Sequence, residues 1–252
     1  MRYAFAGDRQ ISCNILTFLI EKGYKPSFLF VTDGQSSSHA EELIKTSQLE
    51  DEYIFRSKED IQNDKKMQLL KSANLHYIFG IHYPYIISDD LLNTPSIGFL
   101  NLHPAFLPYN KGWNTPSWAI IDKTPYGATL HFMSEQLDQG DIIHQKEITI
   151  DSDDTANSIY HKVLKLEEVV FKEAFNDLVS LNPPRKKQIE KGTNYRKSDL
   201  KKVQKIRMDD KVKVADFIDK LRALTTNNPK ELAYYIENGK KIGVRIEFVE
   251  LD

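Results

Sequence analysis

The sequence predicts an α/β fold: a Rossmann-like, mostly parallel sheet followed by a small C-terminal helix and β-hairpin. Over roughly the first third of the chain, short apolar runs alternate with helix-length segments, the pattern of βαβ units. Two strand-like segments and one long helical repeat follow. Near the C-terminus, Asn238-Gly239 stands between two strand-like runs, which is a strong hairpin signal.

The elements of the first part are predicted from apolar periodicity and from residues that end helices. Continuous or alternating apolar runs predict strands at Arg2–Ala6, Phe28–Val31, Tyr53–Phe55, Leu75–Ile81 and Ile97–Leu102. Helical spacing covers 11–20, Glu41–Leu49 and Ile61–Ser72, and Gly23 ends the first of these helices. Strands separated by helices in this way predict parallel neighbours with helices on both faces of the sheet.

The second part begins at about residue 126. Strands are expected at Ala128–Met133 and Asp141–Ile150, and a long helix is expected to end before Asn182-Pro183-Pro184. A connector rich in Lys and Arg covers 185–205, and we interpret it as solvated chain around the main domain. A helix from Val214 to Leu224 and a hairpin follow. We therefore expect a catalytic domain at 1–200, including the connector, and a small region at 206–252.

Composition and charge narrow the class of protein. The chain of 252 residues has 34 Lys+Arg and 36 Asp+Glu, a net charge of −2, which does not favour nucleic acid as the main partner. A single cysteine, Cys13, excludes an internal disulfide and a multi-cysteine zinc site. No signal peptide and no apolar stretch of membrane-spanning length is visible. These observations indicate a cytoplasmic globular protein, with enzymes as the leading class.

The chemistry is concentrated in the segment around Asn101 and His103. One residue separates them, so on a continuing strand both side chains project from the same face. Pro104 ends the strand there, at the edge where open α/β sheets place their sites. An amide that donates to a developing oxyanion beside an imidazole that handles protons suits acyl transfer.

The residues nearby indicate direct attack by the substrate. Cys13, the only thiol, lies in a distant apolar helix, and no Gly-x-Ser-x-Gly elbow occurs. A substrate amine therefore replaces an enzyme nucleophile in this interpretation. The turn after the Ala128–Met133 strand offers three carboxylates, and Asp138 is the best placed of them to reach the first strand end.

The ordered motifs resemble the N10-formyltetrahydrofolate-dependent formyltransferases. The motifs are Asn101-x-His103-Pro104-x-x-Leu107-Pro108-x-x-x-Gly112, Gly127-Ala128-Thr129-Leu130-His131-Phe132-Met133 and Leu137-Asp138-x-Gly140-Asp141. They cover roughly residues 72–150, and their order and spacing make chance recurrence implausible. The resemblance implies that Asn101, His103 and Asp138 are the catalytic triad.

The resemblance also implies N10-formyltetrahydrofolate as co-substrate and no metal. The pterin would bind to the segment after the Leu75–Ile81 strand, largely through backbone groups. The implied contact residues are Gly80, Ile81, His82, Tyr83, Tyr85 and Met133. A nicotinamide cofactor is not favoured, because Gly7-Asp8-Arg9-Gln10 lacks the Gly-x-Gly-x-x-Gly phosphate cradle.

Chain length helps to distinguish the groups of this family that act on different acceptors. The chain is longer than the glycinamide ribonucleotide enzymes, and its C-terminal region is too short and too balanced in charge for an initiator-tRNA enzyme. The family members that act on nucleotide-linked amino-dideoxy sugars, such as dTDP sugars, fit best. Formylation of methionyl-tRNA or another small amine, hydrolysis of the formyl donor and a non-enzymatic binding module remain alternatives, although the last would need a broken triad.

Aromatic and basic residues after the His-Pro motif suit a nucleotide sugar. The predicted substrate contacts are Tyr109, Lys111, Gly112 and Trp113, with Arg196 or Arg222 as further groups for the pyrophosphate. Trp118 is expected in the core, and His131 is expected to be a structural side chain without a catalytic role. The apolar hairpin predicts a homodimer, because such an edge is usually paired or covered.

Overall fold

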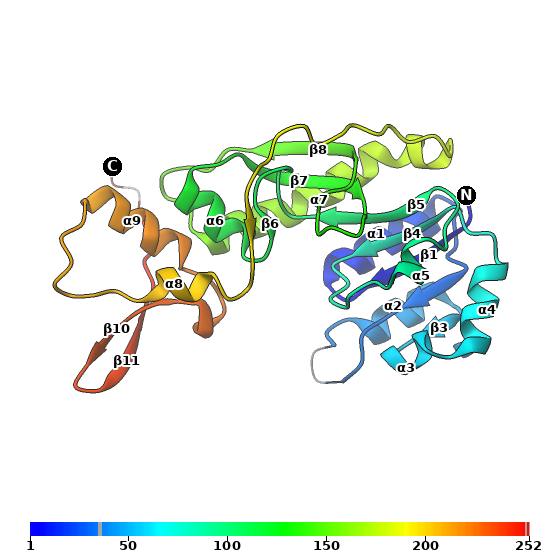
Figure 1. Cartoon of the computed structure of the whole chain (residues 1–252), viewed down its shortest axis with the longest axis horizontal. Helices are drawn as coiled ribbons and strands as arrows, with labels where there is room; N and C mark the ends of the chain where they lie inside the picture. Colours follow the sequence, from blue (N-terminus) through cyan, green and yellow to red (C-terminus); the bar gives the residue numbers. More distant parts are fainter. Residues whose placement is uncertain (35–36, 250, 252) are drawn as a thin grey trace. The chain divides into compact units, whose positions relative to one another are not determined.

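A seven-stranded sheet in the order β3-β2-β1-β4-β5-β7-β8 organises the chain (Figure 1). The computed structural model describes residues 1–34, 37–249 and 251. The strands of this sheet are β1 (Tyr3–Gly7), β2 (Phe28–Phe30), β3 (Ile54–Phe55), β4 (Tyr77–Ile81), β5 (Gly98–His103), β7 (Tyr126–Phe132) and β8 (Ile142–Ile148). The pairs among β1 to β5 are parallel, and β7 is antiparallel to β5, so the predicted mostly parallel sheet is confirmed.

The helices follow the predicted alternation in the first part of the chain. They are α1 (Gln10–Glu21), α2 (Ala40–Ser47), the 3₁₀ turn η2 (Asp51–Tyr53), α3 (Lys58–Ile61), α4 (Asp64–Ser72) and α5 (Asp89–Leu92). The prediction of a single helix over Ile61–Ser72 is wrong, because α3 ends at Ile61 and a new helix, α4, begins at Asp64. Asn63 then caps α4 by accepting from the backbone N–H groups of Lys65 and Lys66 at 3.1 and 3.2 Å.

The remaining elements include several that the sequence analysis did not predict. They are β6 (Lys111–Gly112), α6 (Thr115–Asp122), α7 (Ala156–Val179), β9 (Asn194–Tyr195), α8 (Leu200–Gln204), α9 (Val214–Ala223), the 3₁₀ turn η3 (Pro229–Glu231), β10 (Ala233–Glu237) and β11 (Lys240–Val244). Of these, α7, α9 and the β10–β11 hairpin were expected. The connector over 185–205 carries β9 and α8, so it is more structured than the composition suggests.

The chain divides into two units by its internal contacts. The first unit comprises 1–103, 129–145 and 167–188, and the second comprises 104–128, 146–166 and 189–252. The first unit has an apolar core that includes Phe30, Phe55, Ile78 and Phe99. The second unit has a smaller core that joins Trp118 to Leu200, Leu224 and Ala233.

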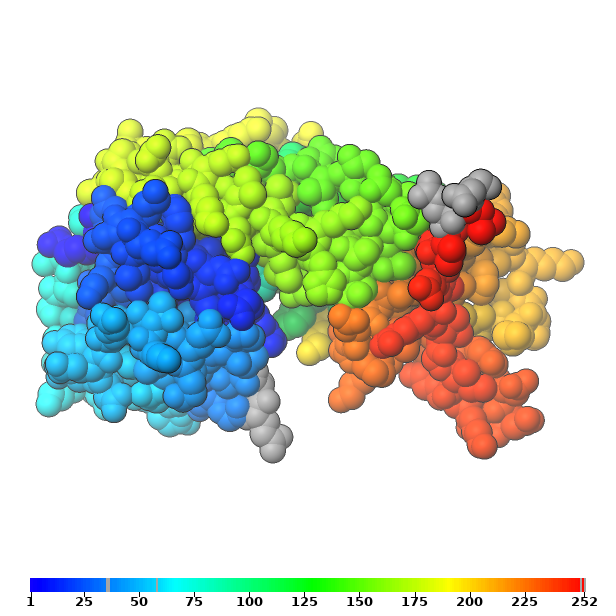
Figure 2. Space-filling model, turned by 180° about the vertical axis from the view of Figure 1, so that it is seen from behind, coloured from blue at the N-terminus to red at the C-terminus, as the bar shows by residue number. Residues whose placement is uncertain are grey.

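The hairpin of the second unit has the predicted two-residue turn. Glu237 and Lys240 are paired, and Asn238 and Gly239 both have positive φ values, 49° and 77°. Positive φ at both central residues is the condition for the type I′ turn that matches strand twist. The hairpin, red to orange in Figure 2, lies at the surface, and Ile236 is 52% exposed.

None of the helices in the described part of the chain combines the length and apolarity that a bilayer crossing requires.

Candidate active site

Two predicted site residues project from β5 in the first unit. Asn101 and His103 are two positions apart on this strand, so they share a face. Asn101 pairs with Gly80 of β4 on one side and with His131 of β7 on the other. His103 is the last residue of β5 and is 7% exposed, so its ring sits in a largely dry environment.

Asp138 lies close to this pair, as expected from the sequence. It belongs to the loop that joins β7 to β8, and it is buried although Glu135, Gln136 and Leu137 before it are exposed. Its Oδ2 atom lies 3.6 Å from Nε2 of His103, and its Oδ1 atom lies 3.7 Å from Nε2 of His131. These separations are beyond hydrogen-bond length but within ion-pair range. The structure therefore brings the three predicted triad members together.

His131 is a fourth member of the cluster. Its Nδ1 atom lies 2.8 Å from the carbonyl oxygen of Phe132, and its Nε2 atom lies 3.3 Å from Nδ2 of Asn101. Burial lowers the pKa of His131 to about 4, although the Asp138 carboxylate opposes this shift. A neutral ring with its proton on Nδ1 donates to Phe132 and accepts from the Asn101 amide. His131 thus orients the amide of Asn101.

The sequence predicts a strand at His131 but indicates no link between this side chain and the site. The antiparallel register, in which Asn101 faces His131, supplies that link. This pairing is non-local and cannot be read from the β7 sequence by itself. The one sequence signal for a role of His131 is that a histidine occurs in a mostly apolar strand within the motif segment.

The cluster suits acyl transfer without an enzyme nucleophile. The amide of Asn101 and the ring of His103 can both donate to an oxygen that gains negative charge, and Asp138 can accept a proton or stabilise a protonated His103. Cys13 is buried in α1, and burial, with a contribution from Glu42, raises its pKa to about 12. A thiol with that pKa is protonated at neutral pH and is a poor nucleophile.

The predicted pterin residues lie in the same unit, at the end of β4 and after β7. Gly80 and Ile81 are the last two residues of β4 and pair with Asn101 and Leu102. A Cβ atom on Gly80 would lie 2.8 Å from the Phe99 ring, so a larger residue here would force that ring to move. Tyr83 and Met133 pack, partly buried, against the apolar core of this unit. Their contacts with a pterin stay a prediction.

Tyr85 and Met133 are held by polar contacts of their own. The Tyr85 hydroxyl donates to Oδ1 of Asp33 at 2.5 Å, and the Met133 backbone N–H donates to the Phe99 carbonyl at 2.7 Å. The rings of Tyr83 and Tyr85 meet edge to face at 5.3 Å. The segment after β4 is therefore ordered by side-chain contacts within the first unit.

His82, the residue after β4, forms a buried ion pair. It has a positive φ of 52°, and its Nε2 atom lies 2.9 and 3.0 Å from the two carboxylate oxygens of Glu167 on α7. Burial works against protonation of His82, but the Glu167 carboxylate raises the pKa of His82 above its ordinary value. The family resemblance places His82 near the pterin, but nothing in the sequence indicates its partner Glu167, which lies 85 positions further along the chain.

The four predicted substrate residues lie together in the second unit. Backbone pairing joins β6 to β9, and the Tyr109 hydroxyl donates to Oε2 of Glu190 at 2.7 Å. Lys111 is buried, with its Nζ atom 3.5 Å from the Lys191 carbonyl oxygen. Gly112 has a φ of 88°, and a Cβ atom there would lie 2.3 Å from the Tyr195 carbonyl oxygen.

Trp113 and Trp118 differ in solvent exposure. Trp113 is 50% exposed, with the Lys197 ammonium 4.9 Å from its ring centroid. Trp118 is buried and stacks on Tyr195 at 3.9 Å, so its prediction as a core residue is confirmed. An exposed aromatic face on Trp113 is compatible with a sugar or a base. The substrate contacts of all four residues remain predictions.

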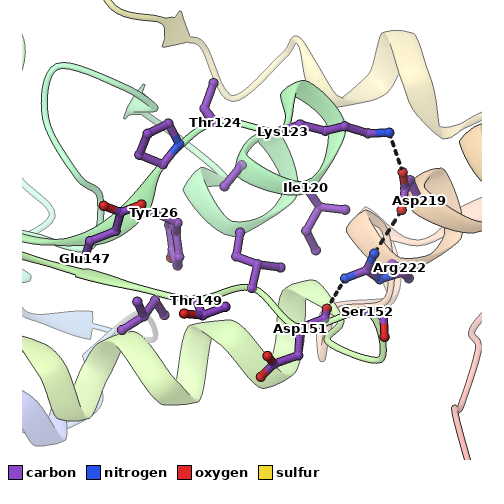
Figure 3. A pocket seen from close by; sticks show the side chains of 14 residues that line it. Ile120, Lys123, Thr124, Tyr126, Glu147, Thr149, Asp151, Ser152, Asp219 and Arg222 are labelled. Atoms are coloured by element: carbon purple, nitrogen blue, oxygen red, sulfur yellow. Dashed lines mark hydrogen bonds and ion pairs between the residues drawn. The ribbon is translucent and has the colours of Figure 1, made fainter.

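The second unit also contains a cavity of about 900 Å³ beside α6 and α9 (Figure 3). Figure 3 shows Arg222 between Asp219 and Asp151: its guanidinium donates to the Asp219 carboxylate at 2.9 Å and to the Asp151 carbonyl. Its Nε atom donates to the Asp154 carbonyl at 2.7 Å. Arg222 therefore braces the cavity wall, and its contact with a pyrophosphate stays a prediction.

In the part of the chain that the structure describes, no three His, Cys, Asp or Glu side chains gather as a metal-binding group.

Comparisons with known proteins identify formyltransferases as the relatives of this chain. A family model described as formyl transferase matches residues 29–175, and a model described as N-formyltransferase dimerization C-terminal domain matches residues 199–250. A dTDP-4-amino-4,6-dideoxyglucose formyltransferase of Mycobacterium bovis is 31% identical over 147 residues, 58% of this chain and 63% of that protein. The chain thus aligns with less than two thirds of that relative's length.

Two solved structures resemble the whole chain. A 4-N formyltransferase from Francisella tularensis has 27% identity and a TM-score of 0.82, covering 99% of this chain and 98% of that one. A sugar N-formyltransferase from Shewanella sp FDAARGOS_354 has 25% identity and a TM-score of 0.82, covering 100% and 99%. The expected fold class, including the C-terminal helix and hairpin, is confirmed by these similarities.

Proposed function

Because the chain belongs to the formyl transferase family, we propose that it transfers a formyl group from N10-formyltetrahydrofolate to the amine of a nucleotide-linked amino-dideoxy sugar. The observation that carries this proposal is the cluster of Asn101, His103 and Asp138 beside the end of β5. The relatives support the acceptor class: one is named for a dTDP-4-amino sugar and another for 4-N formylation.

The residues of the first unit fit the proposed donor. Tyr83 and Met133 offer partly buried apolar surface that suits a flat pterin ring, and Gly80 near the end of β4 pairs with Asn101 of the candidate triad. Gly80, Ile81, His82 and Tyr85 complete the proposed donor site. When bound, N10-formyltetrahydrofolate supplies a formyl carbonyl that an amine can attack.

The proposed mechanism gives each of these side chains a stated role. Asn101, oriented by His131, donates its amide N–H to the formyl oxygen as that oxygen gains negative charge. His103 donates to the same oxygen. Asp138 supports His103 and relays the proton that the attacking amine loses. As the oxyanion collapses, the bond between the formyl carbon and N10 breaks, and tetrahydrofolate leaves with that proton on N10. No covalent enzyme intermediate is formed in this scheme.

The second unit is the proposed place of acceptor recognition and assembly. Tyr109, Lys111, Gly112 and Trp113 would contact the nucleotide sugar, with dTDP as the nucleotide. The match of residues 199–250 to a dimerization model supports a homodimer formed through the C-terminal region. We retain a catalytic domain at 1–200 and a C-terminal region at 206–252, and we place the enzyme in the cytoplasm without a membrane or nucleic-acid partner.

A panel of acceptors tests this function. The protein is incubated with N10-formyltetrahydrofolate and, separately, dTDP-4-amino-4,6-dideoxyglucose, its 3-amino isomer and UDP-linked amino sugars, and mass spectrometry detects the formamide. We expect formylation of at least one nucleotide-linked amino sugar and slow donor turnover without an acceptor. Rapid donor turnover without an acceptor would indicate a hydrolase, and formylation of charged initiator tRNA alone would indicate the tRNA enzyme.

A further inference from the structure

The first residues of the connector lie against the strands that frame the proposed site. The backbone of Lys186 exchanges two hydrogen bonds with that of Ile142, at 2.8 and 2.9 Å. The Arg185 guanidinium donates to the Ile97 carbonyl at 2.8 Å and stacks 3.6 Å from the centroid of the Phe132 ring. These contacts fix the path of the chain as it arrives at Gln188.

Gln188 then binds the backbone of the loop that carries Asp138. Its Nε2 atom donates to the carbonyl oxygen of Asp138 at 2.9 Å and to that of Gly140 at 2.8 Å. Both partners are acceptors, so only the NH₂ end of the side chain can make these bonds. The two bonds together determine the orientation of the amide and clamp the backbone on both sides of Gln139.

The loop needs such a hold because of its own conformation. Asp138 has a φ of 53°, in the left-handed region that residues with a Cβ atom disfavour. A Cβ atom on Gly140 would lie 1.8 Å from the Phe132 carbonyl oxygen, so the loop passes directly over the end of β7. Asp138 is buried, whereas the three residues before it, Glu135, Gln136 and Leu137, are exposed.

We propose that Gln188 is a positioning residue that holds the loop over 138–140 so that the Asp138 carboxylate stays beside His103. This inference rests on the proposed function for its catalytic consequence. It also gives the start of the Lys- and Arg-rich connector a specific task. Loss of the two bonds lets the loop relax, and the 3.6 Å separation between Asp138 and His103 widens. A displacement of about 1 Å in a catalytic group can cost on the order of 100-fold in rate.

The test compares Gln188→Met with Lys187→Met. The first variant keeps the side-chain length and removes the donor, and the second places the same side chain at the exposed neighbouring position. We expect Gln188→Met to lower kcat by about 10- to 100-fold, with KM for both substrates within about twofold. Lys187→Met should keep kcat within about twofold. Hydrogen exchange in the 134–142 segment should be at least about tenfold faster in Gln188→Met only.

A double variant shows whether Gln188 acts through Asp138. In an Asp138→Asn background, measured in single turnover, Gln188→Met should change the rate by less than about twofold, because the group that it positions is already lost. An equal loss in both backgrounds would overturn the proposal, and so would an unchanged kcat in Gln188→Met.

The exchange measurement separates this proposal from the proposed function. If the wild-type protein formylates no acceptor, the function is wrong, while exchange in the 134–142 segment still reports whether Gln188 holds the loop. Unchanged exchange in Gln188→Met would overturn the clamp whatever the activity. Gln188→Glu, which places a carboxylate against two carbonyl oxygens, should accelerate exchange at least as much as Gln188→Met.

Discussion

The two units hold their candidate site residues by different means. In the first unit, side chains contact one another: His131 accepts from Asn101, and Asp138 lies beside both His103 and His131. In the second unit, backbone hydrogen bonds fix the segment that carries the candidate residues. Strand β6 pairs with β9. The Lys111 N–H donates to the Thr193 carbonyl and the Trp113 N–H to the Tyr195 carbonyl, each at 3.0 Å.

Side-chain identity is therefore expected to matter more in the first unit than in the second. A cluster that works through an amide, two imidazoles and a carboxylate loses activity when any one of these side chains is replaced, most of all where the group acts directly on the substrate. A loop held through its backbone keeps its shape through most side-chain changes, but it depends on glycines where backbones come close. The two regions should therefore respond in opposite ways to the same kind of substitution.

The largest effect is expected at the triad. Asn101→Ala, His103→Ala and Asp138→Ala should each lower kcat by at least about 100- to 1,000-fold while the far-UV circular dichroism stays unchanged, because the proposed mechanism uses Asn101 and His103 at the formyl oxygen and Asp138 for support of His103 and proton transfer. Lys202→Met, which removes one exposed ion pair with Asp199, is the control from the second unit and should keep kcat within about threefold. Turnover near wild type in any of the three alanine variants would remove that residue from the mechanism.

His131 is expected to matter less, since it acts through Asn101. His131→Phe keeps a ring in the buried site and removes the acceptor for the Asn101 amide. The loss of one buried hydrogen bond is worth about 1–3 kcal/mol, so kcat should fall about 10- to 100-fold. Steady-state kinetics, with thermal unfolding as the control for folding, checks this. A change in KM with unchanged kcat would place His131 in substrate binding instead.

In the second unit, Gly192 should be sensitive although it has no side chain. Its φ is 60°, and a Cβ atom would lie 1.9 Å from the Pro108 carbonyl oxygen. Gly192→Ala should lower the free energy of unfolding by about 1–3 kcal/mol. Gly23→Ala is the matched control, because Gly23 has a φ of 86° with nothing within 4 Å of the added Cβ. Equal losses in the two variants would mean that the close approach to Pro108 contributes nothing.

The smallest effect is expected from the His82–Glu167 pair and depends on pH. Glu167 raises the pKa of His82 above its unfolded value of 6.5, so the pair stabilises the folded state fully below about pH 6.5 and ceases to do so as the pH rises through the folded pKa. The charged groups facing His82 are Glu167 on α7 and, with opposite sign, Arg9 before α1. The Tm difference between wild type and Glu167→Gln should be at least about 2 °C larger near pH 6 than near pH 9. A difference that grows with pH would contradict the assignment.

Much of the first unit could be predicted because its signals are local. The apolar runs of β1, β4 and β5 are continuous, and the spacing of Asn101 and His103 alone places them on one face. Asp138 could be chosen because a turn between two strands returns the chain to the same edge. The structure confirms that these three lie together, and their roles stay predictions.

The features that could not be predicted from the sequence depend mainly on contacts between segments that are far apart in the chain. His131 joins the site only through the antiparallel register of β7 on β5, and Gln188 reaches the Asp138 carbonyl across 50 positions of sequence. The break between α3 and α4 had a local signal, because Asn63 is a good N-cap residue, but the apolar repeat concealed it. β6 and β9 are two-residue strands, too short for periodicity to reveal.

In the proposed mechanism the acceptor amine attacks the formyl carbon directly, and the side-chain cluster of the first unit stabilises the charge. Initial velocities measured while N10-formyltetrahydrofolate and the amino sugar are varied together distinguish this mechanism from one with a formylated enzyme. We expect intersecting double-reciprocal lines and an unmodified protein mass after incubation with the donor alone. Parallel lines, together with a protein heavier by one formyl group, would contradict it.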